Sequence, residues 1–153
     1  MANDTTDGMA MLSFEECRHL LRAGGVGIIA LRGVEAPVLR PVNFALHERS
    51  SNGARPAAVE VLRNSCLLIR TGEGRILEAA IGGEPASFVI SAIDGLEHTG
   101  WSVVVTGRLV DRSRVEGIDA VPLRPWARAE KNRFVGLSIE EISGRRIAGG
   151  VVG

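Results

Sequence analysis

The chain has 153 residues, of which 45% are hydrophobic and 24% charged, and it carries 18 basic and 18 acidic residues. This length and apolar content suit a single domain with one hydrophobic core. The balanced charge provides no general attraction to nucleic acids or anionic membranes, and the 4% aromatic content leaves few residues for stacking on nucleic-acid bases. We therefore expect neither a nucleic-acid partner nor a membrane partner.

The N-terminal segment MANDTTDGMA is polar and acidic, without the basic start and apolar stretch of a signal peptide. We expect residues 1–12 to form a disordered tail. The longest apolar runs, such as VGIIAL, fall short of the roughly 20 residues that span a bilayer, so we expect a cytoplasmic protein. Cys17 and Cys66 lack metal-binding spacing and are expected to be buried as small apolar residues. The three histidines lie far apart, and no metal site is predicted.

A capped helix begins the predicted domain. Ser13 and Glu16 have the spacing of a capping box, and apolar residues including Cys17 and Leu21 then recur on one helical face. Two β-type runs, VGIIALRG and PVLRPVNFALHE, follow with a short link that suits a hairpin. Pro41 cannot donate a ladder hydrogen bond, which predicts an edge or a bulge at this position.

The rest of the chain alternates strands with turns. RSSNGARPAA is predicted to be an exposed loop, Ser65 to Thr71 a strand, and EGRILEAAIGG a short helix after a Gly-rich turn. PASFVISAID and WSVVVTGRLVDRS form a strand pair, RVEGIDAVPL suggests another helix, and NRFVGLSIEEISGRRI suggests a last strand bent at Gly136. About six strands with mostly short links favour an antiparallel barrel.

The order of these segments resembles the flavin-binding split-barrel superfamily, the pyridoxamine 5′-phosphate oxidase-like proteins. The likeness covers Ser13 to Ile147 and rests on RPVNFAL, IRTGEGRIL, FVISAID and, most specifically, GWSVVVTGR. It implies a mainly β fold: a six-stranded antiparallel split β-barrel with short flanking helices over residues 13–148, followed by a flexible tail at 149–153. It also implies a homodimer that holds FMN, or alternatively a deazaflavin coenzyme, in a groove between two barrels.

The segment RTGEGR follows a predicted strand and precedes a helix, an arrangement that presents backbone N–H groups to a phosphate. Gly72 would contribute its backbone, and Arg70, Thr71 and Arg75 would add side-chain donors. The alternative is a plain glycine turn with solvated arginines, and the resemblance favours the phosphate. Relatives often carry GTKL where this chain has GRIL, so Ile76 occupies the usual lysine position. Arg75 then either replaces that lysine or leaves the phosphate more weakly held.

Two further segments are candidates for contact with the flavin ring. In PVNFAL, strand alternation puts Asn43 on the face opposite Val42 and Phe44. The resemblance implies that backbone groups of Val42 and Asn43 meet the polar edge of the ring, and that Arg40 faces either the cofactor or the partner subunit. The alternative is an ordinary edge strand with a solvated asparagine.

In GWSVVVTG, alternation separates Trp101, Val103 and Val105 from Ser102 and Val104. If the first set fills the barrel, the second faces the groove or the partner. Ser102 matches the family position of a polar residue that contacts the flavin. Trp101 either covers the pocket or packs in the core, which is the commoner role for an aromatic residue at the start of a strand.

No nucleophile–base pair or close carboxylate pair is evident, and a flavin would itself supply the redox chemistry. No catalytic residue is assigned. The late segment LRPWARAEKNRF, with Trp126, Arg128 and Lys131, either reaches the partner's cofactor site or is a solvated loop. The resemblance implies an FMN-dependent oxidoreductase that exchanges a hydride or electrons with a small molecule. A deazaflavin-dependent reductase and a non-catalytic flavin- or haem-binding carrier are the alternatives.

Overall fold

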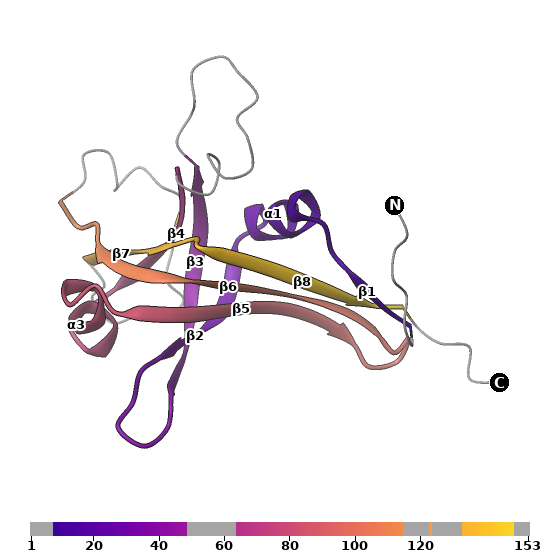
Figure 1. Ribbon diagram of the computed structural model, residues 1–153, viewed down its shortest axis with the longest axis horizontal. Helices are drawn as coiled ribbons and strands as arrows, with labels where there is room; N and C mark the ends of the chain where they lie inside the picture. Colours follow the sequence, from indigo (N-terminus) through magenta and orange to yellow (C-terminus); the bar gives the residue numbers. More distant parts are fainter. Residues whose placement is uncertain (1–7, 49–63, 115–122, 124–132, 149–153) are drawn as a thin grey trace, which may run out of the picture.

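The computed structural model describes residues 8–48, 64–114, 123 and 133–148. Figure 1 shows their helices and strands, coloured along the sequence. The helices are α1 (Phe14–Arg22) and α3 (Arg75–Ile81). The strands are β1 (Met9–Met11), β2 (Gly25–Leu31), β3 (Val38–Glu48), β4 (Ser65–Thr71), β5 (Pro85–Asp94), β6 (Thr99–Asp111), β7 (Arg133–Ser138) and β8 (Glu141–Ile147). Neither described helix is long and apolar enough to cross a membrane.

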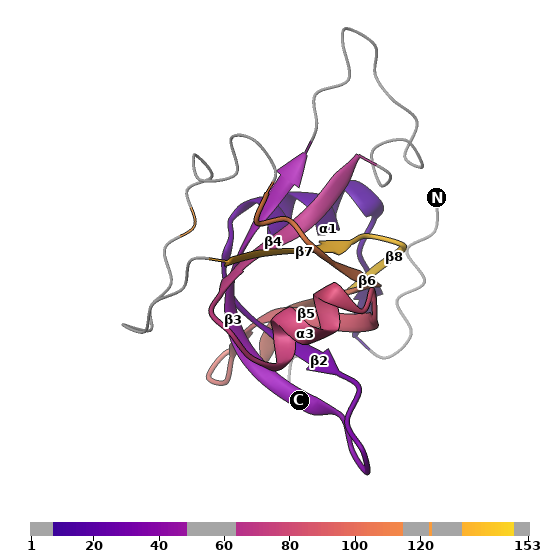
Figure 2. The same cartoon turned by 90° about the vertical axis from the view of Figure 1, so that its left-hand side faces the viewer.

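The strands form one antiparallel sheet in the order β1-β8-β6-β5-β2-β3-β4-β7, and β7 also pairs with β6. This last pairing closes β2 to β7 into a six-stranded barrel, which Figure 2 shows with the strands around the interior and α3 at the near end. β8 and β1 continue the sheet along β6, outside the closed barrel. The predicted mainly β split barrel with flanking helices is confirmed.

Apolar side chains of alternate residues fill the barrel. Phe44 and Phe88 meet edge to face, with ring centroids 4.9 Å apart, an arrangement that aromatic pairs prefer. Gly27 lies beneath the Phe88 ring, where any Cβ would overlap the ring atoms. Val103 and Val105 are fully buried in the same core. The period-2 pattern of these strands therefore determines which face is internal.

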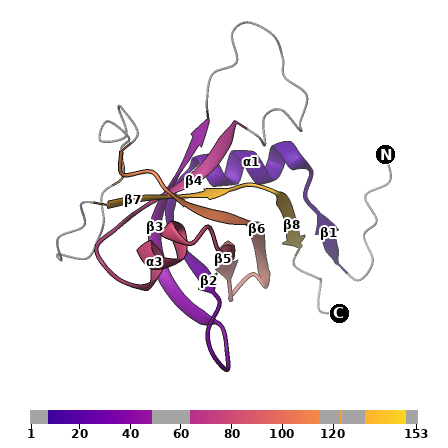
Figure 3. The ribbon, with the colours of Figure 1, turned by 60° about the vertical axis from the view of Figure 1, so that its left-hand side comes forward.

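Helix α1 packs across β8 and the barrel, as Figure 3 shows. The predicted capping box is present: Ser13 Oγ accepts from the Glu16 N–H at 3.2 Å, and Glu16 Oε2 accepts from the Ser13 N–H at 2.7 Å. The backbone hydrogen bond lowers the pKa of Glu16. Cys17 and Leu21 are buried against the core, as predicted, and burial raises the pKa of the Cys17 thiol. Cys66 is also buried, and the two cysteines form no disulfide with each other.

Two expectations need correction. Met9–Met11, predicted to belong to a disordered tail over residues 1–12, pairs with β8 as β1, which gives the exposed backbone edge of β8 hydrogen-bonding partners. The predicted last strand is two strands, and Gly136 lies inside β7, opposite Leu68. The break comes after Ser138, because β7 must bridge β4 and β6 to close the barrel whereas β8 pairs with an earlier part of β6.

Pro41 lies opposite Ile28 in the part of β3 that extends beyond β4, in agreement with its predicted edge position. Several other predictions fall on residues outside the described part of the chain. These are the loop RSSNGARPAA, most of the helix RVEGIDAVPL, the segment with Trp126, Arg128 and Lys131, and the tail at 149–153.

Candidate functional site

All the predicted site residues except Trp101 and Ser102 belong to one region, where β4 separates from β3. The β3–β4 ladder runs from Phe44, opposite Ile69, to Glu48, so the RPVN part of β3 lies beyond the end of β4. The chain leaves β4 at Thr71, two residues after Ile69, and enters the Gly-rich turn before α3. Antiparallel pairing therefore brings this turn beside the earlier part of β3. The residues of this first group are Arg40, Val42, Asn43, Arg70, Thr71, Gly72 and Arg75.

Asn43 projects outward from the barrel, because its neighbours Val42 and Phe44 are buried inside. The alternation predicted for PVNFAL is thus present. Arg40 is exposed, and its guanidinium donates to the carbonyl of Leu39 at 3.0 Å. Arg70 holds its guanidinium 5.5 Å from the centroid of the Phe134 ring, within cation–π range.

Arg75 is engaged in an ion pair that the sequence did not reveal. Its guanidinium donates to both carboxylate oxygens of Glu84, at 2.7 and 3.2 Å, and to the carbonyl of Arg32 at 3.0 Å. The side-chain hydrogen bond raises the pKa of Arg75 and lowers that of Glu84. Arg75 thus joins the start of α3 to β5 and to the β2–β3 hairpin. A phosphate at this turn would have to share the guanidinium with Glu84 or displace it.

Ser102 lies outside the barrel, as the alternation of GWSVVVTG requires. Val103 and Val105 are fully buried, whereas Val104 is 39% exposed on the same face as Ser102. Trp101 faces the other way: it packs against the core cluster and lies opposite Ala92 on β5. Its packing role is therefore present, while its side chain also reaches the edge of the pocket described next.

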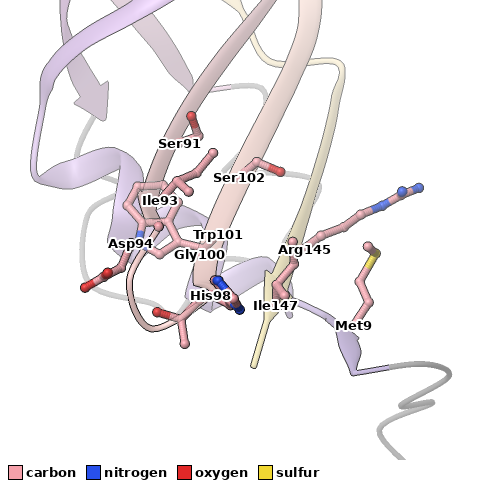
Figure 4. A pocket seen from close by; sticks show the side chains of 12 residues that line it. Met9, Ser91, Ile93, Asp94, His98, Gly100, Trp101, Ser102, Arg145 and Ile147 are labelled. Atoms are coloured by element: carbon pink, nitrogen blue, oxygen red, sulfur yellow. The ribbon is translucent and has the colours of Figure 1, made fainter. Parts of the chain in front are cut away.

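A pocket of about 480 Å³ lies on the Ser102 face of β5, β6 and β8. Ser102 lies between Ser91 and Arg145, because it is opposite both in the two ladders. Figure 4 shows Ser102 between them and the β5–β6 turn at the far end of the pocket. The lining residues are Met9, Ser91, Ile93, Asp94, Gly95, His98, Thr99, Gly100, Trp101, Ser102, Arg145 and Ile147.

Sequence reasoning missed Ser91 and Arg145, although both belong to segments read as strands. Alternation assigns each to one of two faces, but only the register of β6 with β5 and β8 shows that they share a face with Ser102. The alternation that assigns each residue to a face can be read from the sequence, but the strand pairing that brings the three residues together cannot.

The candidate phosphate contact Arg75 and the candidate ring contact Ser102 are far apart within one chain. The Leu109 N–H donates to the Glu84 carbonyl, so the Arg75–Glu84 pair lies near Leu109 on β6. Ser102 is seven residues away on this strand, which at about 3.3 Å per residue is roughly 23 Å. This separation exceeds the length of FMN from its ring to its phosphate.

Comparison with known proteins identifies the same fold. The sequence model of the pyridoxamine 5′-phosphate oxidase family matches residues 13–146. A protein of Corynebacterium glutamicum described as a candidate pyridoxamine 5′-phosphate oxidase has 24% identity and a TM-score of 0.66, with 92% of this chain and 98% of that chain covered. No curated protein matches the chain.

Two further solved structures are described by their ligand. The FAD-binding protein of Mycobacterium smegmatis has 25% identity and a TM-score of 0.58, over 91% of this chain and 98% of its own. The FAD-binding protein of Mesorhizobium loti has 19% identity and a TM-score of 0.65, over 92% and 97%. Both share the architecture of this chain.

Proposed function

Because the chain belongs to the pyridoxamine 5′-phosphate oxidase family, we propose that it is a flavin-dependent oxidoreductase that acts on a small molecule as a homodimer. The observation that carries this proposal is the position of Ser102. The residue that the family resemblance assigns to the flavin lines an open pocket on the outer face of the barrel. Pockets of this size, with apolar walls and a few polar groups, are typical small-molecule sites.

The polar groups of the pocket fit the ring of a flavin. The Ser102 hydroxyl can donate to or accept from the carbonyl and N–H groups of the pyrimidine edge. Arg145, opposite Ser102, supplies a positive charge that favours the negative charge of a reduced ring. A bound flavin would supply the redox chemistry, and the protein would orient the ring and tune its charge.

The Gly-rich turn after β4 fits the phosphate group of FMN. Gly74 has a φ of 138° and open space where a Cβ would be, so the backbone at the start of α3 is accessible. Arg75 lies directly after it, with its guanidinium on Glu84. We propose that a phosphate at this turn takes hydrogen bonds from the backbone and shares Arg75 with Glu84.

A single FMN cannot reach both Arg75 and Ser102 in one chain, since the Arg75–Glu84 pair and Ser102 are roughly 23 Å apart along β6. A second copy resolves this: the turn and β3 of one subunit would hold one part of the flavin, and Ser102 of the other subunit would contact the ring. The outer face offers a surface for this contact. Val26, Ile28 and Val104 are each about two-fifths exposed there, and contiguous apolar surface of this kind marks interaction sites.

The test is to purify the protein after expression with a flavin supply and to identify its chromophore by absorbance and mass. We expect FMN in stoichiometric amount, bleached by a reduced nicotinamide or by dithionite and reoxidised by a small-molecule acceptor. FAD or a deazaflavin in the mass spectrum would correct the cofactor. A bound flavin that no donor or acceptor turns over would make the protein a carrier, and no flavin affinity at all would contradict the proposal.

A further inference from the structure

A row of three polar side chains crosses the pocket from β5 to β8. Ser91 lies opposite Ser102 in one ladder, and Ser102 lies opposite Arg145 in the next. Directly paired residues project from the same face, so the two hydroxyls and the guanidinium lie at one level of the sheet. Within the described part of the chain Arg145 forms no ion pair, whereas Arg146, on the other face, lies 3.9 Å from Glu16.

The next row of the same face is apolar and hollow. Ile93 lies opposite Gly100, Gly100 lies opposite Ile147, and Met9 follows on β1. Because Gly100 has no side chain, the floor between the two isoleucines is bare backbone. A flat apolar group fits such a gap, with isoleucine side chains on either side of it.

The remaining charged group of the pocket lies at its opposite end. Asp94 is three residues beyond Ser91 on β5, about 10 Å along the strand. Its Oδ1 accepts from the N–H groups of Leu96 and Glu97 at 2.9 and 3.1 Å, which holds the carboxylate in the β5–β6 turn near His98. The pocket thus has a cation at the barrel end and a carboxylate at the turn end.

We propose that this pocket binds a small aromatic carboxylate. Its ring lies over Gly100 between Ile93 and Ile147, and its carboxylate is bound by Arg145 and the Ser102 hydroxyl. In Figure 4 the exposed Arg145 side chain extends past β8 on the side of Met9, so it reaches the carboxylate by a rotamer change of the kind common on binding. The carboxylate end is thereby kept away from Asp94.

The inference rests on the proposed function in one respect. Ser102 is also the proposed flavin contact, and its hydroxyl can accept from a ring N–H while it donates to the carboxylate. A carboxylate bound here then lies beside the flavin and represents the substrate class of the enzyme. The binding itself requires no flavin, and it can be measured independently of turnover.

The experiment is isothermal titration of the full-length protein with 2-naphthoate and with its uncharged analogue 2-naphthalenemethanol. We expect 2-naphthoate to bind. Arg145→Gln should weaken the affinity for 2-naphthoate about tenfold or more by removing a charge-assisted hydrogen bond, and it should leave the affinity for the alcohol unchanged. Arg146→Gln, which removes the same charge from the opposite face of β8, is the matched control and should leave both affinities unchanged.

A second pair of variants tests the apolar wall. Ile93 is 81% exposed, so Ile93→Ala should fold normally. It should weaken the binding of both probes about fivefold, because both lose the same apolar contact. Ile81→Ala on α3, at a residue that is 67% exposed, should change neither affinity.

Three results would overturn the inference: no 2-naphthoate binding to the unaltered protein, equal effects of Arg145→Gln and Arg146→Gln, or an unchanged affinity in Ile93→Ala. If the first occurred in a protein fully loaded with flavin, the proposed function would stand and only the carboxylate site would fail. Naphthoate binding with the expected Arg145 dependence in a protein that takes up no flavin would support the site and contradict the proposed function.

Discussion

At the scale of single residues, the direction of a side chain separates structural roles from ligand-binding ones. Val103 and Ser102 are adjacent on β6, yet Val103 is fully buried in the barrel and Ser102 lines an open pocket. Arg75 shows the opposite situation, since a residue predicted to bind a ligand already has a protein partner in Glu84. In each case we expect a substitution at one residue to have a different effect from a substitution at its neighbour or partner.

We expect Ser102→Val to leave the free energy of unfolding within about 0.5 kcal/mol of the original, because the residue lies outside the core. It should shift the absorbance or reduction potential of the bound flavin, since it removes a hydroxyl at the ring's polar edge. Val103→Ser should instead destabilise the fold by roughly 1–3 kcal/mol by burying a polar group. Thermal unfolding without ligand and flavin spectroscopy compare the two. A destabilised Ser102→Val with an unchanged flavin would assign β6 a purely structural role.

For the phosphate end of the flavin, we expect Arg75→Ala to weaken the binding of FMN about tenfold. The binding of riboflavin, which has no phosphate, should change much less. Glu84→Gln should have the opposite effect on FMN, because it releases the guanidinium from its ion pair. Fluorescence titration of both flavins with both variants measures this. Equal losses of FMN and riboflavin in Arg75→Ala would mean that Arg75 serves only to join α3 to β5 and the hairpin.

At the scale of elements, glycines in the sheet allow α1 and β7 to approach it closely. Helix α1 reaches β8 at Gly144, where a Cβ would lie 2.6 Å from Cys17 Sγ and 2.8 Å from Leu12 Cδ1. At the crossing of β7 over β6, a Cβ on Gly107 would overlap the carbonyl of Ser138. These glycines allow the helix and the closing strand to pack directly on the sheet.

We therefore expect Gly144→Ala to destabilise the protein by about 1–3 kcal/mol, because the added methyl overpacks the contact between α1 and β8. Gly95→Ala is the matched control: Gly95 lies in the β5–β6 turn with nothing within 4 Å of a Cβ, and it should leave stability nearly unchanged. Urea unfolding of the two variants makes the comparison. Equal stabilities would show that α1 moves aside without cost.

At the scale of the whole molecule, the barrel is closed and packed, so the residues proposed to bind the flavin lie on its outside. The outer face of β2 and β6 carries Val26, Ile28 and Val104, and it continues toward the pocket at Ser102. A second outer cluster, formed by Cys66, Leu68 and Phe134, is instead covered by Leu123 of the same chain. The first face thus has no intramolecular cover among the residues described, which makes it the surface for the proposed second copy.

We expect Val104→Asp to give a monomer in light scattering and to abolish flavin retention, because a charge would be buried between the two copies. Val110→Asp, at a residue on the same strand that is 42% exposed beyond the proposed interface, should leave the dimer and its flavin intact. A monomer that retains flavin fully would defeat the two-chain site, and so would a dimer unaffected by Val104→Asp.

Local chemistry in the sequence determined most of the elements. Ser13 and Glu16 predict the start of α1, Gly82 and Gly83 follow the end of α3, and the alternation around Val103 and Phe44 predicts the buried faces, because each depends on residues close together in the chain. The order of the motifs was sufficient to predict the family.

Tertiary structure alone decided what depends on pairing between distant segments. The row of Ser91, Ser102 and Arg145 follows from strand register, which a local pattern does not encode. The break between β7 and β8 has the same origin, because β7 pairs with β4 and the last residues of β6, whereas β8 pairs with an earlier part of β6. The ion pair of Arg75 with Glu84 depends on how the two ends of α3 meet, and it keeps Arg75 far from Ser102. Local sequence determined which side chains face outward, and only the fold decided which of them meet.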